Sequence, residues 1–155
     1  MQDQSLHDLY QTVILDHARA PRNQQRPEPC THEAVGDNPL CGDRVTIFLR
    51  IGEGGRIEDA GFLAQGCAIA VASASLMTQA LRGRTEAEAR QLETAIEALC
   101  TSEEDAGAGI DDDESLTSLR ALSGVRAFPM RVKCVTLPWQ TLLAALDRSG
   151  GTSTE

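Results

Sequence analysis

Five cysteines are the residues of this 155-residue chain whose type and placement could do chemistry. Three of them stand where the sequence pattern changes: Cys41 in a turn before a strand pattern, Cys67 at the start of a helical pattern, and Cys134 before the last helical pattern. A thiol at a helix N-terminus or beside a lysine has a lowered pKa, because its charged form is favoured there. The thiolate can bind a metal ion or act as a nucleophile. Because the count is odd, the cysteines cannot form a complete set of disulfides within the chain.

Asp43 adds an oxygen donor to these sulfurs. It lies two residues after Cys41, so a turn or bulge could aim both side chains at one point. Cys41, Asp43, Cys67 and Cys134 would together supply the four ligands of a tetrahedral site, which suits zinc, and iron–sulfur chemistry is also possible. A site with one carboxylate is less closed than one with four cysteines, so a ligand exchanges more readily. Spacing alone does not decide whether these residues bind a metal ion, because no C-x-x-C pair is present and free cysteines are commonly small buried hydrophobes.

The other two cysteines and the histidines are expected to take no part in such a site. Cys30 lies in a proline-rich connection, and Cys100 ends a helical pattern, where the helix dipole opposes a thiolate. His7 and His17 are expected to pack or cap at the first helix, and His32 to lie in a loop. The sequence contains no Ser–His–Asp order, P-loop or G-x-G-x-x-G motif.

Composition excludes several classes of function. The chain has 14 Lys+Arg against 23 Asp+Glu, a net charge of −9, and only 3% aromatic residues, which argues against nucleic-acid binding. Its hydrophobic content of 41% is too high for a disordered chain. The sequence has neither the pattern of a signal peptide nor the roughly 20 apolar residues of a membrane span. We therefore expect a cytoplasmic protein without membrane or nucleic-acid partners, whose reduced cysteines are more often metal ligands or catalytic groups than disulfides.

The first half of the chain is expected to hold a helix followed by a hairpin. Apolar residues at three- and four-residue spacing predict a helix over residues 5–18, which Pro21 ends. Residues 44–51 alternate between apolar and polar and predict a half-buried strand. A Glu-Gly-Gly turn at 53–55 then predicts a hairpin whose return strand covers residues 57–65.

The second half is expected to be helical. A pattern rich in alanine and serine predicts a helix over residues 68–81, and Thr85 with Glu88 resembles the capping box of another over 85–100. Leucines spaced three apart predict a short helix over 116–122. A terminal helix is expected to run to Leu146, with Thr136 as its N-cap and Pro138 in its first turn.

A hairpin followed by a block of helices is the α+β pattern rather than the alternating βαβ one. We predict a small antiparallel sheet of about three strands packed by helices. The length fits one domain, which we assign to residues 1–148, with a flexible tail over 149–155. Residues 101–114 are acidic and contain glycine, so a solvated surface loop is the simplest interpretation of them.

Four groups of residues, in order along the chain, carry a family resemblance. They are Leu9-Tyr10 through Asp16-His17 with Pro21-Arg22-Asn23, then Asn38-Pro39-Leu40-Cys41-Gly42-Asp43, then Gly66-Cys67-Ala68-Ile69 with Ala72-Ser73-Ala74-Ser75, and Lys133-Cys134 before Leu137 and Trp139. These motifs resemble the U-type iron–sulfur assembly proteins, the IscU and NifU N-terminal family. The resemblance covers about residues 5–147, nearly the whole chain.

This family has two main branches, which differ just before the third cysteine. The scaffold branch, which is IscU-like, carries a histidine there. The SufU-like branch carries a lysine and an insertion between the second and third cysteines. This chain has Lys133 at that position, and the acidic stretch with the short helix around residues 101–124 is similar to the insertion. The chain therefore resembles the SufU-like branch more closely, which implies a SufE/NifU-like fold.

The resemblance implies a zinc site made by Cys41, Asp43, Cys67 and Cys134. It also implies a partner, a pyridoxal-phosphate cysteine desulfurase of the SufS type, whose persulfide sulfur passes to Cys41 as the catalytic residue. Other iron–sulfur assembly proteins would then act downstream. By this resemblance the chain is a zinc-dependent sulfurtransferase.

Three functions remain open: a zinc-dependent sulfur acceptor, a scaffold that assembles and transfers an iron–sulfur cluster, and a zinc-stabilised interaction module. Lys133 favours the acceptor over the scaffold. The pairing of Cys41 with Asp43 favours either over a structural zinc, which more often has four closed ligands. Arg126, Arg131 and Lys133 would place positive charge beside the site and attract an anionic persulfide, but ordinary solvated charges are an equally good interpretation.

Overall fold

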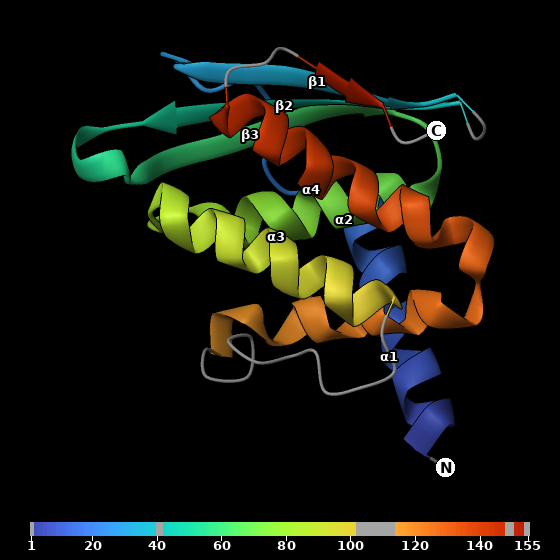
Figure 1. Ribbon diagram of the computed structural model, residues 1–155. Coiled ribbons are helices and arrows are strands. Elements are labelled where there is room, and N and C mark those ends of the chain that lie inside the picture. Colours follow the sequence, from blue (N-terminus) through green and yellow to red (C-terminus); the bar gives the residue numbers. More distant parts are fainter. Residues whose placement is uncertain (1, 40–41, 102–113, 148–150, 154–155) are drawn as a thin grey trace.

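The structure is a computed structural model that describes residues 2–39, 42–101, 114–147 and 151–153 (Figure 1). The predicted helices over 5–18, 68–81 and 85–100 and the predicted hairpin are all present, whereas most of the acidic stretch 101–114 lies outside the described residues. The elements in chain order, with η for a 3₁₀ helix, are α1 (Gln2–Arg19), β1 (His32–Asn38), β2 (Asp43–Ile51), η1 (Glu53–Gly55), β3 (Ile57–Gln65), α2 (Ala68–Leu81), α3 (Glu86–Thr101), η2 (Glu114–Ala127), η3 (Pro129–Arg131), α4 (Val132–Leu146) and β4 (Gly151–Ser153).

The sheet has the order β3-β2-β1-β4. β1 is antiparallel to β2, and β2 is antiparallel to β3. These three antiparallel strands and the helices packed on them confirm the predicted α+β class. η1 makes the tight connection of the β2–β3 hairpin, where Gly54 has a φ of +74°, a conformation that glycine adopts without steric cost.

Two strands differ from the sequence prediction. The sequence predicts a loop at His32, but this residue begins β1, which pairs with β2 along its length. The mostly polar sequence of β1 lacks the apolar run that signals a strand, so tertiary pairing decides its structure. The predicted flexible tail also differs, because Gly151–Ser153 pairs in parallel with Val35–Asp37 as β4. The open edge of β1 offers backbone N–H and C=O groups that such a segment satisfies.

The helices pack together on one side of the sheet (Figure 1). α2 lies at the centre of this layer, where it contacts α1, α4 and β3. The predicted alternation in β2 buries Val45, Ile47 and Leu49 completely. Most of α2 is buried as well, because it has neighbours on several sides and its small side chains let them approach closely.

A buried serine joins α2 to α4. Ser73 Oγ donates to the carbonyl of Val135 at 2.6 Å and accepts from Trp139 Nε1 at 3.1 Å. Val135 directly follows Cys134, and Ser73 lies in the second turn of the helix that begins after Cys67. This contact therefore fixes the two helix ends that carry these cysteines relative to each other.

α4 begins earlier than the sequence predicts. Thr136 was expected as its N-cap, whereas α4 spans Val132–Leu146 and holds Pro138 in its interior. Because Pro138 has no N–H, the carbonyl of Cys134 four residues earlier lacks the usual helical hydrogen bond. Cys134 consequently lies in the first turn of α4 rather than in a loop before it.

His17 ties α1 to α2. Its Nδ1 shares a hydrogen bond of 2.7 Å with Ser75 Oγ, which also accepts the N–H of Arg22 at 2.8 Å. Burial lowers the pKa of His17, so the ring is neutral at neutral pH. The prediction that His17 packs is confirmed, while the side chain of His7 lies outside the described part of the chain.

α3 carries a buried carboxyl group. Glu93 is 4% exposed, and among the described residues its Oε2 has no hydrogen-bond partner. Burial and the neighbouring Glu97 raise the pKa of Glu93 to about 7. Glu97 in turn accepts a hydrogen bond of 3.1 Å from Gln140 Nε2 of α4.

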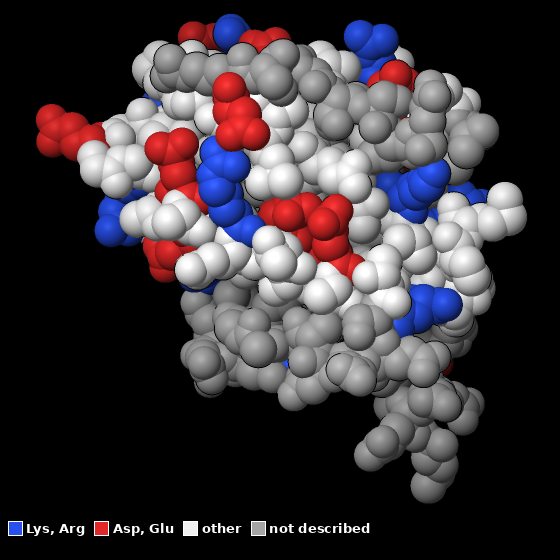
Figure 2. All heavy atoms as spheres, viewed as in Figure 1, with Lys and Arg blue, Asp and Glu red and all other residues white. Residues whose placement is uncertain are grey.

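Among the described residues visible in Figure 2, basic side chains form no continuous surface, and Lys and Arg stand in small groups among acidic and neutral residues. This distribution agrees with the net charge of −9. Within the described residues, no helix combines the length and the apolar character that a bilayer span requires.

Ser73→Ala should lower the free energy of unfolding by about 1–3 kcal/mol, because it leaves the buried Trp139 Nε1 without an acceptor. Urea denaturation followed by the fluorescence of the single tryptophan measures the change. Thr94→Ala is the matched control, since Thr94 Oγ1 donates to the carbonyl of Arg90 at 3.2 Å on an exposed part of α3. Equal losses in the two variants would contradict a stabilising role for the Ser73 contact.

Glu93→Gln should stabilise the protein at pH 8 and flatten its pH dependence. The pKa of Glu93 is about 7 in the fold against an ordinary value of 4.5, so the free energy of unfolding falls as the pH rises through this range. The neutral amide removes that fall, and we expect a gain of about 1–3 kcal/mol at pH 8. Urea denaturation at pH 5 and pH 8 measures it, with exposed Glu53→Gln as control. An unchanged pH profile in Glu93→Gln would show that the buried carboxyl is not the cause.

Candidate metal centre

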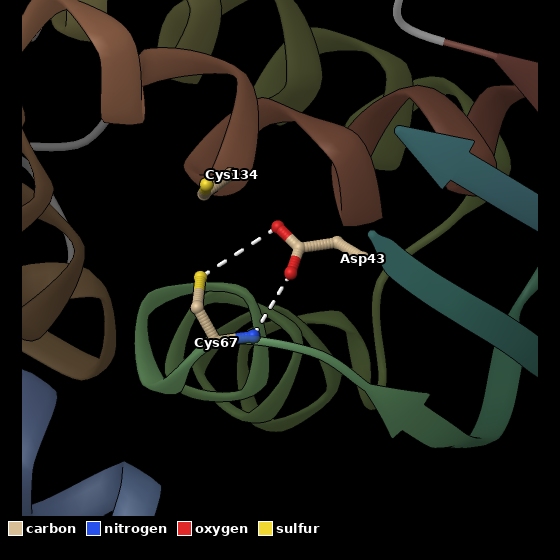
Figure 3. Close-up of side chains that lie close together, drawn as sticks. All are labelled: Asp43, Cys67 and Cys134. Carbon is tan, nitrogen blue, oxygen red and sulfur yellow. Dashed lines mark hydrogen bonds between the residues drawn. The ribbon is translucent and has the colours of Figure 1, made fainter. Parts of the chain in front are cut away.

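Three side chains from three elements meet at the starts of β2, α2 and α4 (Figure 3). Asp43 is the first residue of β2, Cys67 directly precedes α2, and Cys134 lies in the first turn of α4. One ligand atom of each lies within 4.8 Å of the other two, and we name these three residues the Asp-Cys-Cys cluster. The fourth predicted ligand, Cys41, lies outside the described residues.

Asp43 is held by the backbone that leads into α2. It is 1% exposed, and its Oδ1 accepts the N–H of Cys67 at 2.8 Å. Its Oδ2 lies 3.6 Å from Cys67 Sγ, and both contacts are drawn in Figure 3. Gly66 makes this close approach possible, because its φ is +151° and a Cβ there would overlap the carboxylate.

Cys67 carries the negative charge of the two thiols. Its pKa is lowered to about 6, chiefly by the hydrogen bond from the Cys134 thiol and also by the backbone N–H groups of Ala70 and Ile69. Burial and the Asp43 carboxylate act in the opposite direction. At neutral pH this side chain is therefore a thiolate, the form that binds metal ions.

Cys134 is the protonated member of this pair of thiols. It is completely buried, and the pKa of its thiol is raised because the proton is shared with the Cys67 sulfur. Burial and the Asp43 carboxylate add to this effect. A divalent cation would take the place of the shared proton, since metal ligation deprotonates thiols. Two sulfurs and one carboxylate oxygen are donors that zinc accepts, and their convergence in a largely buried place fits such an ion.

The remaining cysteines lie apart from the cluster. Cys30 is half-buried, and its thiol donates to the carbonyl of His32 at 3.2 Å. Cys100 is buried at the end of α3, and burial raises the pKa of its thiol to about 12. Among the residues that the structure describes, the Asp-Cys-Cys cluster is the one group of three potential metal ligands.

Two of the three predicted basic residues are exposed and lie close to Cys134 in the chain. Arg131 ends η3 and Lys133 precedes Cys134, and both side chains are exposed. Arg126 is half-buried instead, and its Nε donates to the carbonyl of Leu99 at 2.6 Å. Arg126 therefore has a structural contact between η2 and α3 that its position in the sequence does not reveal.

Two buried residues have contacts that the sequence analysis does not assign. Ser73 fixes α4 on α2, as described above. Tyr10 is 4% exposed, its ring stacks on that of Phe128 with centroids 6.2 Å apart, and burial chiefly raises the pKa of its hydroxyl to about 12. The signal that could have found both is their place in the motifs that carry the family resemblance.

The sequence of this chain is similar to those of known proteins. The family model described as the NifU-like N terminal domain matches residues 9–135. The chain is 38% identical over 150 residues to the zinc-dependent sulfurtransferase SufU of Bacillus subtilis (strain 168), covering 95% of each protein. It is 34% identical over 145 residues to the iron–sulfur cluster assembly scaffold protein IscU of Streptococcus pyogenes serotype M1, covering 93% of this chain and 86% of that one.

Solved structures share the fold. One, described as an iron–sulfur cluster assembly scaffold protein for the SUF system of Fervidobacterium islandicum AW-1, aligns with a TM-score of 0.78 and 31% identity over 90% of this chain and 98% of that one. The N-terminal part of a NifU-like protein from Brucella abortus aligns with a TM-score of 0.79 over 91% and 94% of the two chains. At 21% identity, the second likeness concerns the fold alone.

Gly66→Ala should lower zinc affinity by about tenfold or more, as disturbing the group that orients a ligand usually does. The new Cβ would displace the Asp43 carboxylate. Gly83→Ala is the matched control, because Gly83 also has a positive φ, +86°, but nothing lies within 4 Å of its Cβ position. Competition with a chromophoric chelator measures the affinity. An equal loss of zinc affinity in both variants would point to backbone strain rather than to the position of Asp43, and unchanged affinity in Gly66→Ala would contradict the prediction.

Proposed function

The chain belongs to the family of NifU-like N-terminal domains, and on that premise we propose that it is a zinc-dependent sulfur acceptor in iron–sulfur cluster assembly. The observation that carries the proposal is the convergence of one carboxylate and two cysteine sulfurs in the Asp-Cys-Cys cluster. A purely structural zinc site more often has four closed cysteine or histidine ligands. The similarity to the SufU sulfurtransferase of Bacillus subtilis, which extends over 95% of this chain, supports the same function.

Four residues would hold the metal ion: Cys41, Asp43, Cys67 and Cys134. The last three converge in the structure, and Cys41 lies two residues before Asp43 in the sequence. Bound zinc would supply the positive charge that keeps the thiols deprotonated at neutral pH while making them weaker nucleophiles.

Cys41 is the residue that would receive the sulfur. Its thiolate attacks the outer sulfur of a persulfide on the donor protein, so that a new S–S bond forms at Cys41 while the donor's S–S bond breaks. The electron pair of the broken bond leaves with the donor cysteine as its thiolate. The exchange therefore needs no external oxidant or reductant, and Cys41 is left with a persulfide that a later thiol can attack in the same way.

The donor would be a pyridoxal-phosphate cysteine desulfurase of the SufS type, and the later thiol would belong to a downstream iron–sulfur assembly protein. Exposed Arg131 and Lys133, close to Cys134 in the chain, present positive charge near the cluster. Such charge favours the approach of an anionic persulfide. We place this chemistry in the cytoplasm, where thiols remain reduced.

A scaffold for iron–sulfur clusters is the second candidate function. The IscU scaffold proteins of Streptococcus pyogenes and Thermotoga maritima are 34% and 33% identical to this chain. Cysteine thiolates are also the usual ligands of iron–sulfur clusters. Lys133 favours the acceptor, because the chain resembles the SufU-like branch at this position.

The protein should hold about one zinc ion per chain and raise the turnover of its desulfurase, because one four-ligand site is expected. Cys41→Ala should abolish this stimulation, measured as alanine formed from cysteine. Cys30→Ser is the control and should keep both zinc and stimulation, since Cys30 lies apart from the cluster. Normal stimulation by Cys41→Ala would refute the acceptor function. Visible absorption of a stable cluster without zinc, after anaerobic purification, would favour the scaffold.

A further inference from the structure

A groove of about 360 Å³ lies on the face of the sheet that points away from the helices (Figure 1). Val45 and Ile47 are completely buried under the helices, so Arg44 and Thr46, which alternate with them in β2, project from the opposite face. We name this cavity the outer groove. Its lining comes from β2, β3 and the connection between α1 and β1, and consists of Gln24, Arg44, Thr46, Leu63, Ala64 and Gln65.

The connection between α1 and β1 covers only part of this face. Phe48 is 4% exposed, and the guanidinium of Arg26 lies 5.8 Å from its ring centre. A Cβ at Gly61, the partner of Phe48 on β3, would overlap the carbonyl of Gln25. Leu63, two residues further along β3, is by contrast 50% exposed. The outer groove therefore begins where this cover ends, and it offers an apolar side chain to solvent.

Arg44 gives the outer groove a positive charge. Its side chain is exposed, and within the described residues it forms no ion pair, not even with Asp37, its neighbour on β1. Gln24 and Gln65 add side-chain amides to the same lining. A guanidinium binds a carboxylate through two parallel hydrogen bonds, and amide N–H groups add further donors. The outer groove thus fits a carboxylate that stands next to an apolar side chain.

The outer groove lies at the end of the sheet where the transferred sulfur would arrive. Arg44 directly follows Asp43, and Gln65 is two residues before Cys67. Cys41 is three residues before Arg44, and three residues of chain span at most about 11 Å. A stable protein–protein interface covers about 800 Å² on each partner, which corresponds to a disc of about 16 Å radius. An interface of this size centred on Cys41 therefore extends as far as Arg44.

We propose that the outer groove is part of the docking surface for the cysteine desulfurase that donates the sulfur. Arg44 pairs with a carboxylate of the desulfurase, and an apolar side chain of the same segment packs on Leu63. Because this chain has a net charge of −9, it does not attract an acidic surface as a whole, so local cations must supply the complementary charge. The inference rests on the proposed function, since the sulfur donor to Cys41 identifies the occupant.

Arg44→Glu tests the charged contact. It should weaken the binding of the zinc-loaded protein to the SufS-type desulfurase of the same organism by about tenfold or more, as the loss of an interface anchor does. Isothermal titration calorimetry measures the affinity. Arg19→Glu is the matched control, because Arg19 ends α1, is exposed and forms no ion pair within the described residues. Equal affinities of the two charge-reversal variants would overturn the proposal.

Leu63→Ala tests the apolar contact without a change of charge and at a distance in sequence from the metal ligands. Binding to the desulfurase should weaken by about fivefold, the effect of losing a moderate interface contact. Leu15→Ala is the matched control, since Leu15 on α1 is 48% exposed against 50% for Leu63. Zinc content, measured on every variant, should equal that of the wild type. Should Arg44→Glu lose zinc, Leu63→Ala decides, and full affinity there or an equal loss in Leu15→Ala would contradict the proposal.

The outcomes separate this proposal from sulfur acceptance. Stimulation of the desulfurase that is equal in the wild type, Arg44→Glu and Leu63→Ala at every concentration would overturn the docking surface and keep the acceptor function. A wild-type protein that binds the desulfurase without stimulating it would refute the acceptor function, while the affinities of the variants still decide the docking surface. Absence of any binding by the wild type would refute both. If the two variants instead lost self-association in sedimentation experiments and kept desulfurase binding, the outer groove would bind a second copy and the proposal would be wrong.

Discussion

The hydrogen bond from the Cys67 N–H to the Asp43 carboxylate is the interaction on which the rest of the site depends. It joins the start of β2 to the start of α2, so the sheet and its central helix are fixed where the ligands meet. The carboxylate is almost completely buried, which is costly unless the charge is hydrogen-bonded or paired. The N-terminus of α2 offsets part of this cost, because its N–H groups and dipole favour an anion. Gly66 is required since any side chain there would take the space of the carboxylate.

The position of Cys134, the third residue of the cluster, depends on contacts between helices rather than on the sheet. Cys134 lies in the first turn of α4. The Ser73 hydroxyl of α2 donates to the carbonyl of Val135, the next residue in the chain, and so joins the two helices at this point. Two helix starts and one strand start therefore converge, although they are far apart in the sequence. The shared proton between Cys67 and Cys134 follows from this closeness, because two buried thiolates beside a carboxylate repel each other until a cation is bound.

The elements with strong periodicity could be predicted from the sequence, and those decided by tertiary contacts could not. The alternation of β2 and the helical spacing of α1 to α3 identify these elements directly. β1 is polar and gains its structure by pairing with β2 from His32 onward, and Pro138 suggests a later start for α4 than the packing allows. The ligand set came from the family resemblance, since spacing alone left buried free cysteines as an equal interpretation. Ser73 carries no chemical signal of its own, because its contacts with Val135 and Trp139 exist only in the folded chain.

Charge bears on which ligand of the proposed site would react. In the proposed site, three thiolates and one carboxylate around a divalent cation would leave a net negative charge in a largely buried place, so the fold must supply donors. The Cys67 N–H donates to the Asp43 carboxylate, and the N–H groups of Ala70 and Ile69 at the start of α2 donate to the Cys67 sulfur. Ligands held in this way are suited to stay in place during exchange, which agrees with the reactive role that we propose for Cys41.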